Sequence, residues 1–312
     1  MHHFDLLVVG DANPDVIVGP LQTDLVFGQR EQLAPTGVLT LGGSGAITAA
    51  GAARLGLKVA LAGRVGDDDG GRFVRAALAE RGVDTSALHT DPSLPTPLTT
   101  VLTRDGDRAI VTSPGTLAAL TADDVPAELL AGSRHVHSSS YFLLPKLAAD
   151  LPALLRAARE HGATTSVDTN DDPAGTWDVG NLLPETDFLL PNAAEAVRLT
   201  GAPDARAAAG LLAARGPVVV VKDGVDGAFL RCGDEVVAAP GIPAEAADTV
   251  GAGDSFNAGF LAGVLAGLPL GTALRCGVLC GGFSVRARGG TAGQATWDDV
   301  LVHLERTESD HS

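Results

Sequence analysis

Short, continuous runs of apolar residues alternate along the chain with longer stretches in which apolar residues recur at helical spacing. Continuous apolar runs are typical of strands that are buried on both faces, as in a parallel sheet covered by helices. The runs that we predict to be strands are residues 6–10, 59–62, 136–138, 165–168, 188–190 and 218–222. The stretches that we predict to be helices are residues 46–55, 71–81, 146–161, 193–199 and 204–215. This alternation predicts an open, doubly wound α/β fold, in which ligands bind at the carboxyl ends of the strands.

Two segments depart from this alternation. Residues 15–38 show no clear helical pattern and contain several turn-forming Gly and Pro residues. Residues 98–112 predict a β-hairpin, because two strand-like runs flank the turn-forming pair Asp105-Gly106. The two segments could pair into a small separate sheet, which would serve either as a functional lid or as a decorative edge or dimer contact. Since we find no linker and no internal repeat, we expect residues 1–312 to form one domain with these insertions.

Composition narrows the class of protein. Hydrophobic residues make up 45% of the 312 residues and charged residues 19%, which indicates a compact globular chain. The formal net charge of −16 disfavours nucleic acid and anionic membrane surfaces as partners. The chain begins without a signal-peptide pattern, and its apolar stretch at 258–268 is too short to span a bilayer. We therefore expect a cytoplasmic protein with neither nucleic acid nor a membrane as its partner.

The sequence Gly251-Ala252-Gly253-Asp254 precedes an apolar stretch at helical spacing, so we predict that it forms the N-terminus of a buried helix. Backbone amides at such an end can bind a phosphate directly, because small residues leave them accessible. A carboxylate beside an anion site is unfavourable unless it has a chemical task, and accepting a proton from an attacking hydroxyl is such a task. An ordinary helix N-cap at Asp254 explains the short motif equally well.

The longer run at 248–256, Asp-Thr-x-Gly-Ala-Gly-Asp-x-Phe, resembles the second signature of the ribokinase/pfkB carbohydrate kinase family. The resemblance covers nearly the whole chain and implies a ribokinase-like fold: a three-layer, doubly wound, mostly parallel sheet with a small inserted β-sheet as a lid. It also implies transfer of the γ-phosphate of ATP to a hydroxyl of a small sugar, as in ribokinases and fructokinases. Asp254 would be the general base, and the amides of Gly251, Ala252 and Gly253 would stabilise charge on the transferring phosphoryl group.

The resemblance also places residues at the sugar. After the first strand, Asn13 and Asp15 match positions that hydrogen-bond substrate hydroxyls, a task that suits an amide and a carboxylate. In the family's first signature, Gly42 and Gly43 would allow the backbone to approach the substrate closely. Asn170 lies in a segment similar to the family's Asp-Pro-Asn and would be a further contact. Without the family context, turn formation by Asn13 and the proline after it would be the simpler interpretation.

Two further segments match the nucleotide side of the family's site. Asn192 and Glu195 match its Asn-x-x-Glu motif and would organise Mg²⁺ and its water ligands near the phosphates of ATP. A capping Asn followed by an acidic first turn is the alternative. Gly224 matches the glycine turn that contacts the nucleotide, and Lys222 and Gly227 flank it as further ATP-binding candidates. For Lys222, a solvated charge at a strand end is the alternative.

In many members of the family, a monovalent cation lies beside the phosphate site. The resemblance would place such a K⁺ ion among Asp248, Val250 and residues 286–290, largely on backbone oxygens, and the sequence leaves open whether it binds. The lids of this family often also form dimers, so a homodimer through segments 15–38 and 98–112 is a further expectation.

Three positions depart from the family's pattern. Ile47 and Val278 stand where members often have Asn, and Asp172 stands where members that act on hexoses or sugar acids often have Arg. A carboxylate-bearing acceptor is therefore disfavoured, and the acceptor itself is left open. One alternative is a nucleoside kinase of the same family, and another is a non-catalytic sensor of sugar or nucleotide, against which the intact Asp254 argues. A dinucleotide-binding oxidoreductase is disfavoured because no G-x-G-x-x-G follows the first strand.

Overall fold

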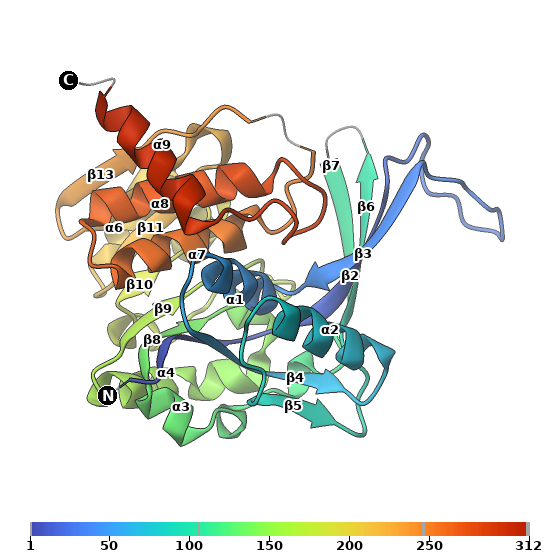
Figure 1. The fold of residues 1–312 in the computed structure, drawn as a ribbon, viewed down its shortest axis with the longest axis horizontal. Coiled ribbons are helices and arrows are strands. Elements are labelled where there is room, and N and C mark those ends of the chain that lie inside the picture. Colours follow the sequence, from blue (N-terminus) through green and yellow to red (C-terminus); the bar gives the residue numbers. More distant parts are fainter. Residues whose placement is uncertain (1, 105–106, 245–246, 310–312) are drawn as a thin grey trace.

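The computed structural model describes residues 2–104, 107–244 and 247–309. Within these residues, one large sheet has the strand order β13-β12-β11-β10-β9-β8-β1-β4-β5 (Figure 1). The strands from β11 to β5 of that order are parallel, and β12 and β13 add an antiparallel edge. The strands are β1 (Phe4–Val9), β4 (Val59–Gly66), β5 (Leu88–Asp91), β8 (Ser133–Ser138), β9 (Thr164–Val167), β10 (Phe188–Leu189), β11 (Val218–Lys222), β12 (Ala228–Cys232) and β13 (Glu235–Ala239). The predicted doubly wound, mostly parallel sheet is confirmed.

Helices cover both faces of this sheet. The helices on one face are α1 (Ser44–Arg54), α2 (Asp69–Glu80), α7 (Ala252–Leu265), α8 (Leu270–Ser284) and α9 (Trp297–Ser309). The helices on the other face are α3 (Ala127–Ala131), α4 (Pro145–Glu160), α5 (Ala193–Thr200) and α6 (Ala205–Ala213). Successive residues of β1 alternate between the two layers, with Leu6 and Val8 in the first core and Leu7 and Val9 in the second. Burial on both sides explains why the strands read as continuous apolar runs.

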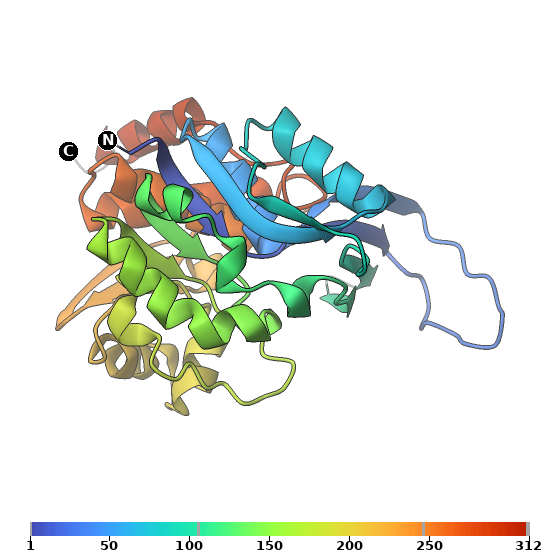
Figure 2. The same cartoon turned by 90° about the horizontal axis from the view of Figure 1, so that it is seen from below.

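The two segments outside the alternation form a separate sheet of four strands in the order β3-β2-β6-β7. Its strands are β2 (Asn13–Gly19), β3 (Thr36–Gly42), β6 (Leu98–Arg104) and β7 (Asp107–Ser113). β2 pairs antiparallel with β3 and parallel with β6, and β6 and β7 form the predicted hairpin. The predicted turn residues Asp105 and Gly106 lie outside the described residues. Figures 1 and 2 show the connection between β2 and β3 extending away from the body of the molecule.

The small sheet contacts the body through an apolar cluster of three residues. Ile17 of β2 and Val101 of β6 pack with Val250, and all three side chains are buried. Val250 directly precedes the Gly-Ala-Gly-Asp sequence. The face of the small sheet that carries Ile17 and Val101 is therefore the face that covers the start of α7.

Close packing against α8 fixes α7 within the core. A Cβ atom at Gly259 would lie 2.6 Å from the carbonyl oxygen of Cys276, and one at Gly263 would lie 2.8 Å from the Cα atom of Ala273. Larger side chains at these positions would separate the two helices. Glycine thus allows the backbones of α7 and α8 to approach each other, which holds the N-terminus of α7 in a defined place.

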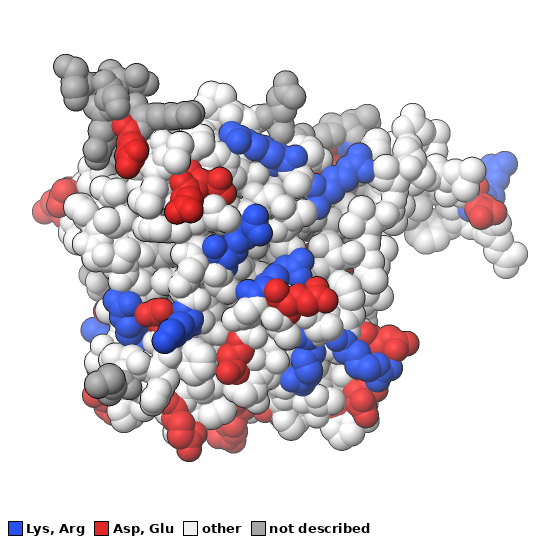
Figure 3. Space-filling view, in the orientation of Figure 1, with Lys and Arg blue, Asp and Glu red and all other residues white. Residues whose placement is uncertain are grey.

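The surface mixes both charges. Figure 3 shows Lys and Arg side chains interspersed with Asp and Glu on one face, so the acidic excess is spread among basic and neutral residues there. Ion pairs such as Arg134 with Asp5, at 2.9 Å, contribute to this pattern. Among the described residues, no helix combines the length and apolarity that crossing a membrane requires.

Candidate active site

The turn before α7 requires glycine at position 251. Gly251 is the N-cap residue of α7 and has φ 72°, in the left-handed region that other residues rarely adopt. A Cβ atom there would lie 2.7 Å from the Cα atom of Gly290 and 3.0 Å from its carbonyl oxygen. Ala252 and Gly253 follow as the first helical residues. The amides at this end of α7 have no partner within the helix, so the turn offers donors and a positive dipole end to an anion.

Asp254 lies in the first turn of α7 and is 8% exposed. The structure shows that it is not the N-cap of this helix, since Gly251 occupies that position and no side chain caps the end. Burial, and then repulsion from Asp168 and Asp11, raises the pKa of Asp254 well above its usual value, although Lys222 and a hydrogen bond from Ser44 act in the opposite direction. A carboxylate of raised pKa beside a turn that offers donors to an anion is a candidate proton acceptor.

Lys222 is an internal cation of this site and not a solvated strand-end charge. Its side chain is 12% exposed, and its Nζ atom lies 2.6 Å from Oδ2 of Asp168. Asn257 of α7 donates to the same Oδ2 atom at 2.5 Å. Burial opposes the charge on both partners, but their attraction outweighs it, so the pKa of Lys222 is raised and that of Asp168 is lowered. A Cβ atom at Gly253 would lie 3.5 Å from Nζ, which places the ammonium beside the anion-binding turn.

Asn192 and Glu195 form the capping box of α5, which is the alternative to a metal site that the sequence left open. Oδ1 of Asn192 accepts from the amide of Glu195, and Oε2 of Glu195 accepts from the amide of Asn192, each at 2.9 Å. A β-bridge joins Asn192 to Lys222, so the box lies beside the buried ion pair. Burial, and then repulsion from Asp168, raises the pKa of Glu195 to about 7. Within the described part of the chain, each Glu195 oxygen accepts one hydrogen bond from Asn192, which leaves a second lone pair on each for a cation or its water.

The two glycines after β11 have different surroundings. Gly224 begins a short 3-10 turn at φ 59°, and a Cβ atom there would meet no atom within 4 Å. Gly227 has φ 99°, and a Cβ atom there would lie 2.2 Å from the carbonyl oxygen of Ala239. Gly224 therefore faces open space that a nucleotide could fill. For Gly227, close packing against the end of β13 already explains why the residue is glycine.

The first two acceptor candidates are held together on β2. Asn13 donates through Nδ2 to Oδ1 of Asp15 at 2.8 Å. A Cβ atom at Gly42 would lie 1.9 Å from that same Oδ1, and one at Gly43 would lie 2.9 Å from Oδ1 of Asn13. The Gly-Gly turn thus admits both polar side chains against the backbone. Burial raises the pKa of Asp15 to about 7; the Asn13 hydrogen bond opposes this shift, and repulsion from neighbouring carboxylates adds to it.

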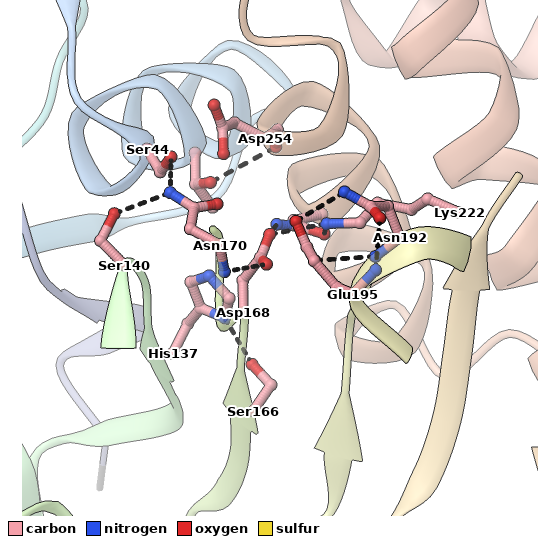
Figure 4. Close-up of polar contacts among 12 residues, drawn as sticks. Ser44, His137, Ser140, Ser166, Asp168, Asn170, Asn192, Glu195, Lys222 and Asp254 are labelled. Atoms are coloured by element: carbon pink, nitrogen blue, oxygen red, sulfur yellow. Dashed lines mark hydrogen bonds and ion pairs between the residues drawn. The ribbon is translucent and has the colours of Figure 1, made fainter. Parts of the chain in front are cut away.

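Asn170 joins the acceptor side to the start of α1. It lies in the loop after β9, has φ 56°, and donates through Nδ2 to Ser44 Oγ at 2.7 Å and Ser140 Oγ at 2.9 Å (Figure 4). Asp172, in contrast, organises its own loop, because its carboxylate accepts from the amides of Ala174, Thr176 and Trp177. The Asp172 carboxylate, which stands where some family members have Arg, therefore stabilises its own loop.

The residues predicted near K⁺ stabilise the turn itself. Oδ1 of Asp248 accepts from the amide of Val250, and Oδ2 accepts from the amide of Gly289, each at 3.0 Å. The amides of Ala247 and Asp248 donate to the carbonyl oxygen of Val285. These bonds tie the chain before α7 to the segment after α8.

Two of the departures from the family pattern are apolar packing positions. Ile47 of α1 packs beneath the turn, since its Cδ1 atom lies 2.5 Å from the position of a Cβ atom on Gly290. Val278 of α8 is 7% exposed and belongs to the core that α7 shares. An Asn at either position would have to find hydrogen-bond partners in an apolar environment.

Sequence reasoning missed several polar residues that the structure brings to this site. Asp11, Ser44, Ser140, Asp168 and Asn257 all lie within the network described above, and four of them are buried. A signal was available for Asp11, Ser140 and Asp168, because the first two lie close after a predicted strand and Asp168 ends one, at the edge where ligands bind. Asn257 gives no such signal, since it lies within an apolar helical stretch.

Comparisons with known proteins agree with this geometry. A family model described as pfkB family carbohydrate kinase matches residues 4–297. The ATP-dependent ribose-1-phosphate kinase of Halopiger xanaduensis is 33% identical over 221 residues, which cover 70% of this chain and 72% of that protein. The ribokinase of Haemophilus influenzae is 29% identical over 315 residues, covering 96% of this chain and 98% of that protein.

A solved structure extends the likeness to three dimensions. Arabidopsis thaliana ribokinase in complex with ribose and ATP matches with a TM-score of 0.85 at 27% identity, and the match covers 98% of this chain and 99% of that chain. Sequence and fold therefore agree over nearly the whole length. The chain belongs to the pfkB family of carbohydrate kinases, has the ribokinase-like fold, and is an ATP-dependent carbohydrate kinase.

Proposed function

We propose that this protein transfers the γ-phosphate of ATP to a hydroxyl of a small sugar, with Asp254 as the general base. The observation that carries the proposal is the position of Asp254, which is buried in the first turn of α7, beside a turn that requires Gly251. Figure 4 shows Ser44 and Asn170, which bond to each other, on the side of Asp254 away from Lys222. A base and an anion-binding turn are thereby brought next to polar groups suited to a polyol.

In the proposed reaction, the acceptor hydroxyl gives its proton to Asp254 as its oxygen attacks the γ-phosphorus of ATP. The amides of Gly251, Ala252, Gly253 and Asp254 stabilise the charge on the transferring phosphoryl group. Lys222 is a further cation next to the turn, since its Nζ atom lies 3.5 Å from the position of a Cβ atom on Gly253. ADP leaves as the phosphorylated sugar forms.

The nucleotide side is proposed to include Asn192, Lys222, Gly224 and Gly227, and Mg²⁺ is proposed near Glu195. The oxygen-rich side chains of Asn192 and Glu195 suit Mg²⁺, which prefers oxygen ligands. Among the described residues, no cluster of three His, Cys, Asp or Glu side chains could hold a metal by itself. A Mg²⁺ ion bound there would supply positive charge that neutralises the phosphates of ATP.

A monovalent cation is a further part of the proposal. Asp248 and Val250 belong to the turn that leads into α7, and two hydrogen bonds to the Asp248 carboxylate fix its shape. A K⁺ ion held by backbone oxygens there would add positive charge next to the phosphate site. Its effect can be measured by comparing turnover in K⁺ with turnover in tetramethylammonium at equal ionic strength.

The acceptor is proposed to bind between Asn13, Asp15, Gly42, Gly43 and Asn170. The Asp15 carboxylate and the Asn13 amide lie against the Gly-Gly turn, so a ring with several hydroxyls could bond to both. Relatives named for ribose 1-phosphate and for ribose make a pentose the first acceptor to test.

The small sheet is proposed to be the lid, within a single domain of residues 1–312. Arg108 of β7 donates to Thr249 Oγ1 at 2.5 Å, which joins the sheet to the turn before α7. A closed lid would exclude water and limit ATP hydrolysis. On its other face, Leu39 and Val111 are 57% and 64% exposed, which supports a homodimer through the lid as a further proposal.

The test is turnover of ATP with a panel of acceptors: D-ribose, ribose 1-phosphate, D-fructose, a 2-keto sugar acid and adenosine. Wild-type protein is expected to phosphorylate a sugar, and Asp254→Asn to lose on the order of 100-fold or more in kcat. Asp299→Asn is the matched control, because Asp299 bonds Thr296 at the start of α9, on the surface. Turnover of Asp254→Asn at the wild-type rate would refute the role of the base, and exclusive turnover of adenosine would indicate a nucleoside kinase. Ligand-induced stabilisation without ATP turnover across the panel would indicate a sensor.

A further inference from the structure

The inner face of the small sheet is the face that carries Ile17 and Val101 and covers the start of α7. These two residues are paired neighbours on β2 and β6, and both pack against Val250. Side chains alternate between the two faces of a strand, so Asp15 and Thr99, two residues earlier in β2 and β6, also lie on the inner face. Asp15 and Thr99 are themselves paired.

A row of polar side chains crosses the inner face at the level of Asp15. Asp15 pairs with Thr40 of β3 and with Thr99 of β6, and Thr99 pairs with Thr112 of β7. Each of the four strands thus contributes one polar residue to this row. The next row along the sheet is apolar and consists of Ile17, Val38, Val101 and Ile110. Because the apolar row already provides the contact with Val250, that contact does not explain the polar row.

Thr99 and Thr112 form a hydrogen-bonded pair. Their Oγ1 atoms lie 3.1 Å apart, and Asn13 donates through Nδ2 to Oγ1 of Thr99 at 3.2 Å. Asn13 also donates to Asp15, so the pair is joined to the two side chains of β2 that are proposed to bind the acceptor. Thr99 is half-buried and Thr112 is exposed. The pair therefore extends the polar surface of the proposed acceptor site onto β7.

The two hydroxyl groups keep hydrogen-bonding capacity for a ligand. Each hydroxyl has one hydrogen, and the bond between Thr99 and Thr112 uses only one of the two. Within the described part of the chain, no acceptor is recorded for the other hydrogen, and the Thr112 hydroxyl bonds only to Thr99. The pair can therefore donate one hydrogen bond and accept another, as a ligand hydroxyl requires.

The two ends of the polar row have different surroundings. At the β3 end, a Cβ atom at Gly289 would lie 3.0 Å from Oγ1 of Thr40, so the segment after α8 covers this residue. At the β7 end, Thr112 is exposed. None of the four side chains in the row is basic, and Asp15 repels an anion when it is ionised. A neutral hydroxyl therefore suits the β7 end better than a phosphate does.

We propose that Thr112 is a specificity-determining residue that hydrogen-bonds one neutral hydroxyl of the acceptor, and that Thr99 is its positioning residue. The hydroxyl in question is a different one from the hydroxyl that receives the phosphoryl group. The acceptor is accordingly a polyol with an unsubstituted hydroxyl on the side that faces the small sheet. This inference rests on the proposed function for the place of the acceptor, and on the register and hydrogen bonds of the small sheet for the roles of Thr99 and Thr112.

The kinetic test combines a substitution in the protein with the loss of one hydroxyl from the acceptor. It uses whichever acceptor of the panel the wild-type protein phosphorylates fastest, together with its single-deoxy analogues. With the wild type, the analogue that lacks the hydroxyl facing Thr112 is expected to lose about tenfold in kcat/KM, the order of one hydrogen bond. Thr112→Val is expected to lose about tenfold with the parent acceptor and nothing further with that analogue. Thr112→Ser, which keeps a hydroxyl, is expected to retain the wild-type discrimination.

The positioning role of Thr99 has its own variant. Thr99→Val is expected to reduce the discrimination against the same analogue and against no other, because the Thr112 hydroxyl would lose the partner that orients it. A general loss of stability would lower kcat/KM for all analogues alike. Unchanged discrimination in Thr99→Val would overturn this role.

The matched control is Thr100→Val. Thr100 is adjacent to Thr99 on β6, but it pairs with Val16 and Val111 and so lies on the outer face of the small sheet. The same substitution there is expected to leave kcat/KM as in the wild type for the parent acceptor and for every analogue. If Thr112→Val changes kcat/KM by the same factor for the parent acceptor and for every analogue, Thr112 bonds none of the hydroxyls and the inference is wrong.

Equilibrium binding separates this inference from the proposed function. Isothermal titration calorimetry without ATP measures Kd for the members of the panel and for their deoxy analogues. A loss of affinity that is confined to one analogue in the wild type and absent in Thr112→Val is expected. That pattern in a protein that phosphorylates no acceptor of the panel supports the inference and refutes the proposed transfer. Turnover in which Thr112→Val keeps the wild-type discrimination overturns the inference and leaves the proposed function standing. A protein that neither binds nor phosphorylates any member of the panel would refute both.

Discussion

The ammonium group of Lys222 lies 2.6 Å from the carboxylate of Asp168, and Asn257 of α7 binds the same carboxylate oxygen. Asp168 is 1% exposed, so water contributes little to the stability of its charge. The ion pair thus joins β11 to the end of β9 directly beneath the first turn of α7. It is a structural element of the fold as well as a source of positive charge at the proposed phosphate site.

Replacing Lys222 alone is therefore expected to destabilise the protein strongly. Lys222→Met leaves the Asp168 carboxylate buried without its cation, which typically costs about 3–5 kcal/mol in the free energy of unfolding. Urea denaturation followed by circular dichroism measures this change. Lys222→Met combined with Asp168→Asn is the control, since it removes both charges together, and it is expected to recover part of the loss. A double variant as unstable as Lys222→Met would show that the pairing of charges is not the cause.

The raised pKa of Asp15 predicts a pH dependence of stability with a defined sign. Its pKa of about 7 in the folded protein lies above the ordinary value of 3.8, so between these values the folded state binds more proton than the unfolded state. The contribution of Asp15 to stability consequently falls as the pH rises from about 4 to about 7.

Asp15→Asn removes this contribution, so the Tm difference between variant and wild type is expected to move in favour of the variant between pH 5 and pH 8. Scanning calorimetry at both pH values measures it. Glu185→Gln is a suitable comparison, because Glu185 forms surface ion pairs with Arg156 and Arg159 far along the chain from this site. A Tm difference for Asp15→Asn that is equal at both pH values would contradict the assigned pKa.

Gly251→Ala is expected to impair both stability and catalysis. Alanine at φ 72° is strained, and its Cβ atom would lie 2.7 Å from the Cα atom of Gly290, so the turn must move away from its backbone neighbour. Gly201→Ala is the matched control: Gly201 follows α5 at φ 69°, and its Cβ atom would meet no atom within 4 Å. The control is expected to cost roughly 1 kcal/mol in unfolding free energy without changing kcat.

The difference between the two alanine variants isolates the contact with Gly290. Gly251→Ala is expected to lose more unfolding free energy than Gly201→Ala. It is also expected to lower kcat at least tenfold, because the amides that are proposed to bind the transferring phosphoryl group would be displaced. Denaturation curves measure the unfolding free energy, and steady-state ATP turnover measures kcat. Equal losses in the two variants would show that conformational strain alone explains the requirement for glycine.

The architecture could be predicted from the sequence because strands that are buried on both faces form continuous apolar runs. Runs such as residues 6–10 are apolar throughout, since Leu6 and Leu7 face different helical layers. The edge strands β5 and β13, and β12 beside β13, were not predicted. β13 carries exposed polar and apolar residues in a short run, and a strand at the edge of a sheet is not required to be apolar on both faces.

The site was only partly predictable, for a different physical reason. Lys222 and Asp168 are 54 residues apart in sequence, and nothing in either local segment indicates that the other neutralises it. Without that partner, Lys222 resembles any charged residue at a strand end. The motif around Asp254 was more informative, because Gly251 and its neighbours lie next to one another in the chain and act together.

Val250 connects the position of the small sheet to the shape of the turn before α7. It directly precedes Gly251, and Ile17 and Val101 of the small sheet pack against it. Movement of that sheet toward the body of the molecule would press on Val250 and so on the turn before α7, the proposed phosphate site. Three apolar side chains would thereby couple the position of the small sheet to the shape of the turn that is proposed to bind phosphate.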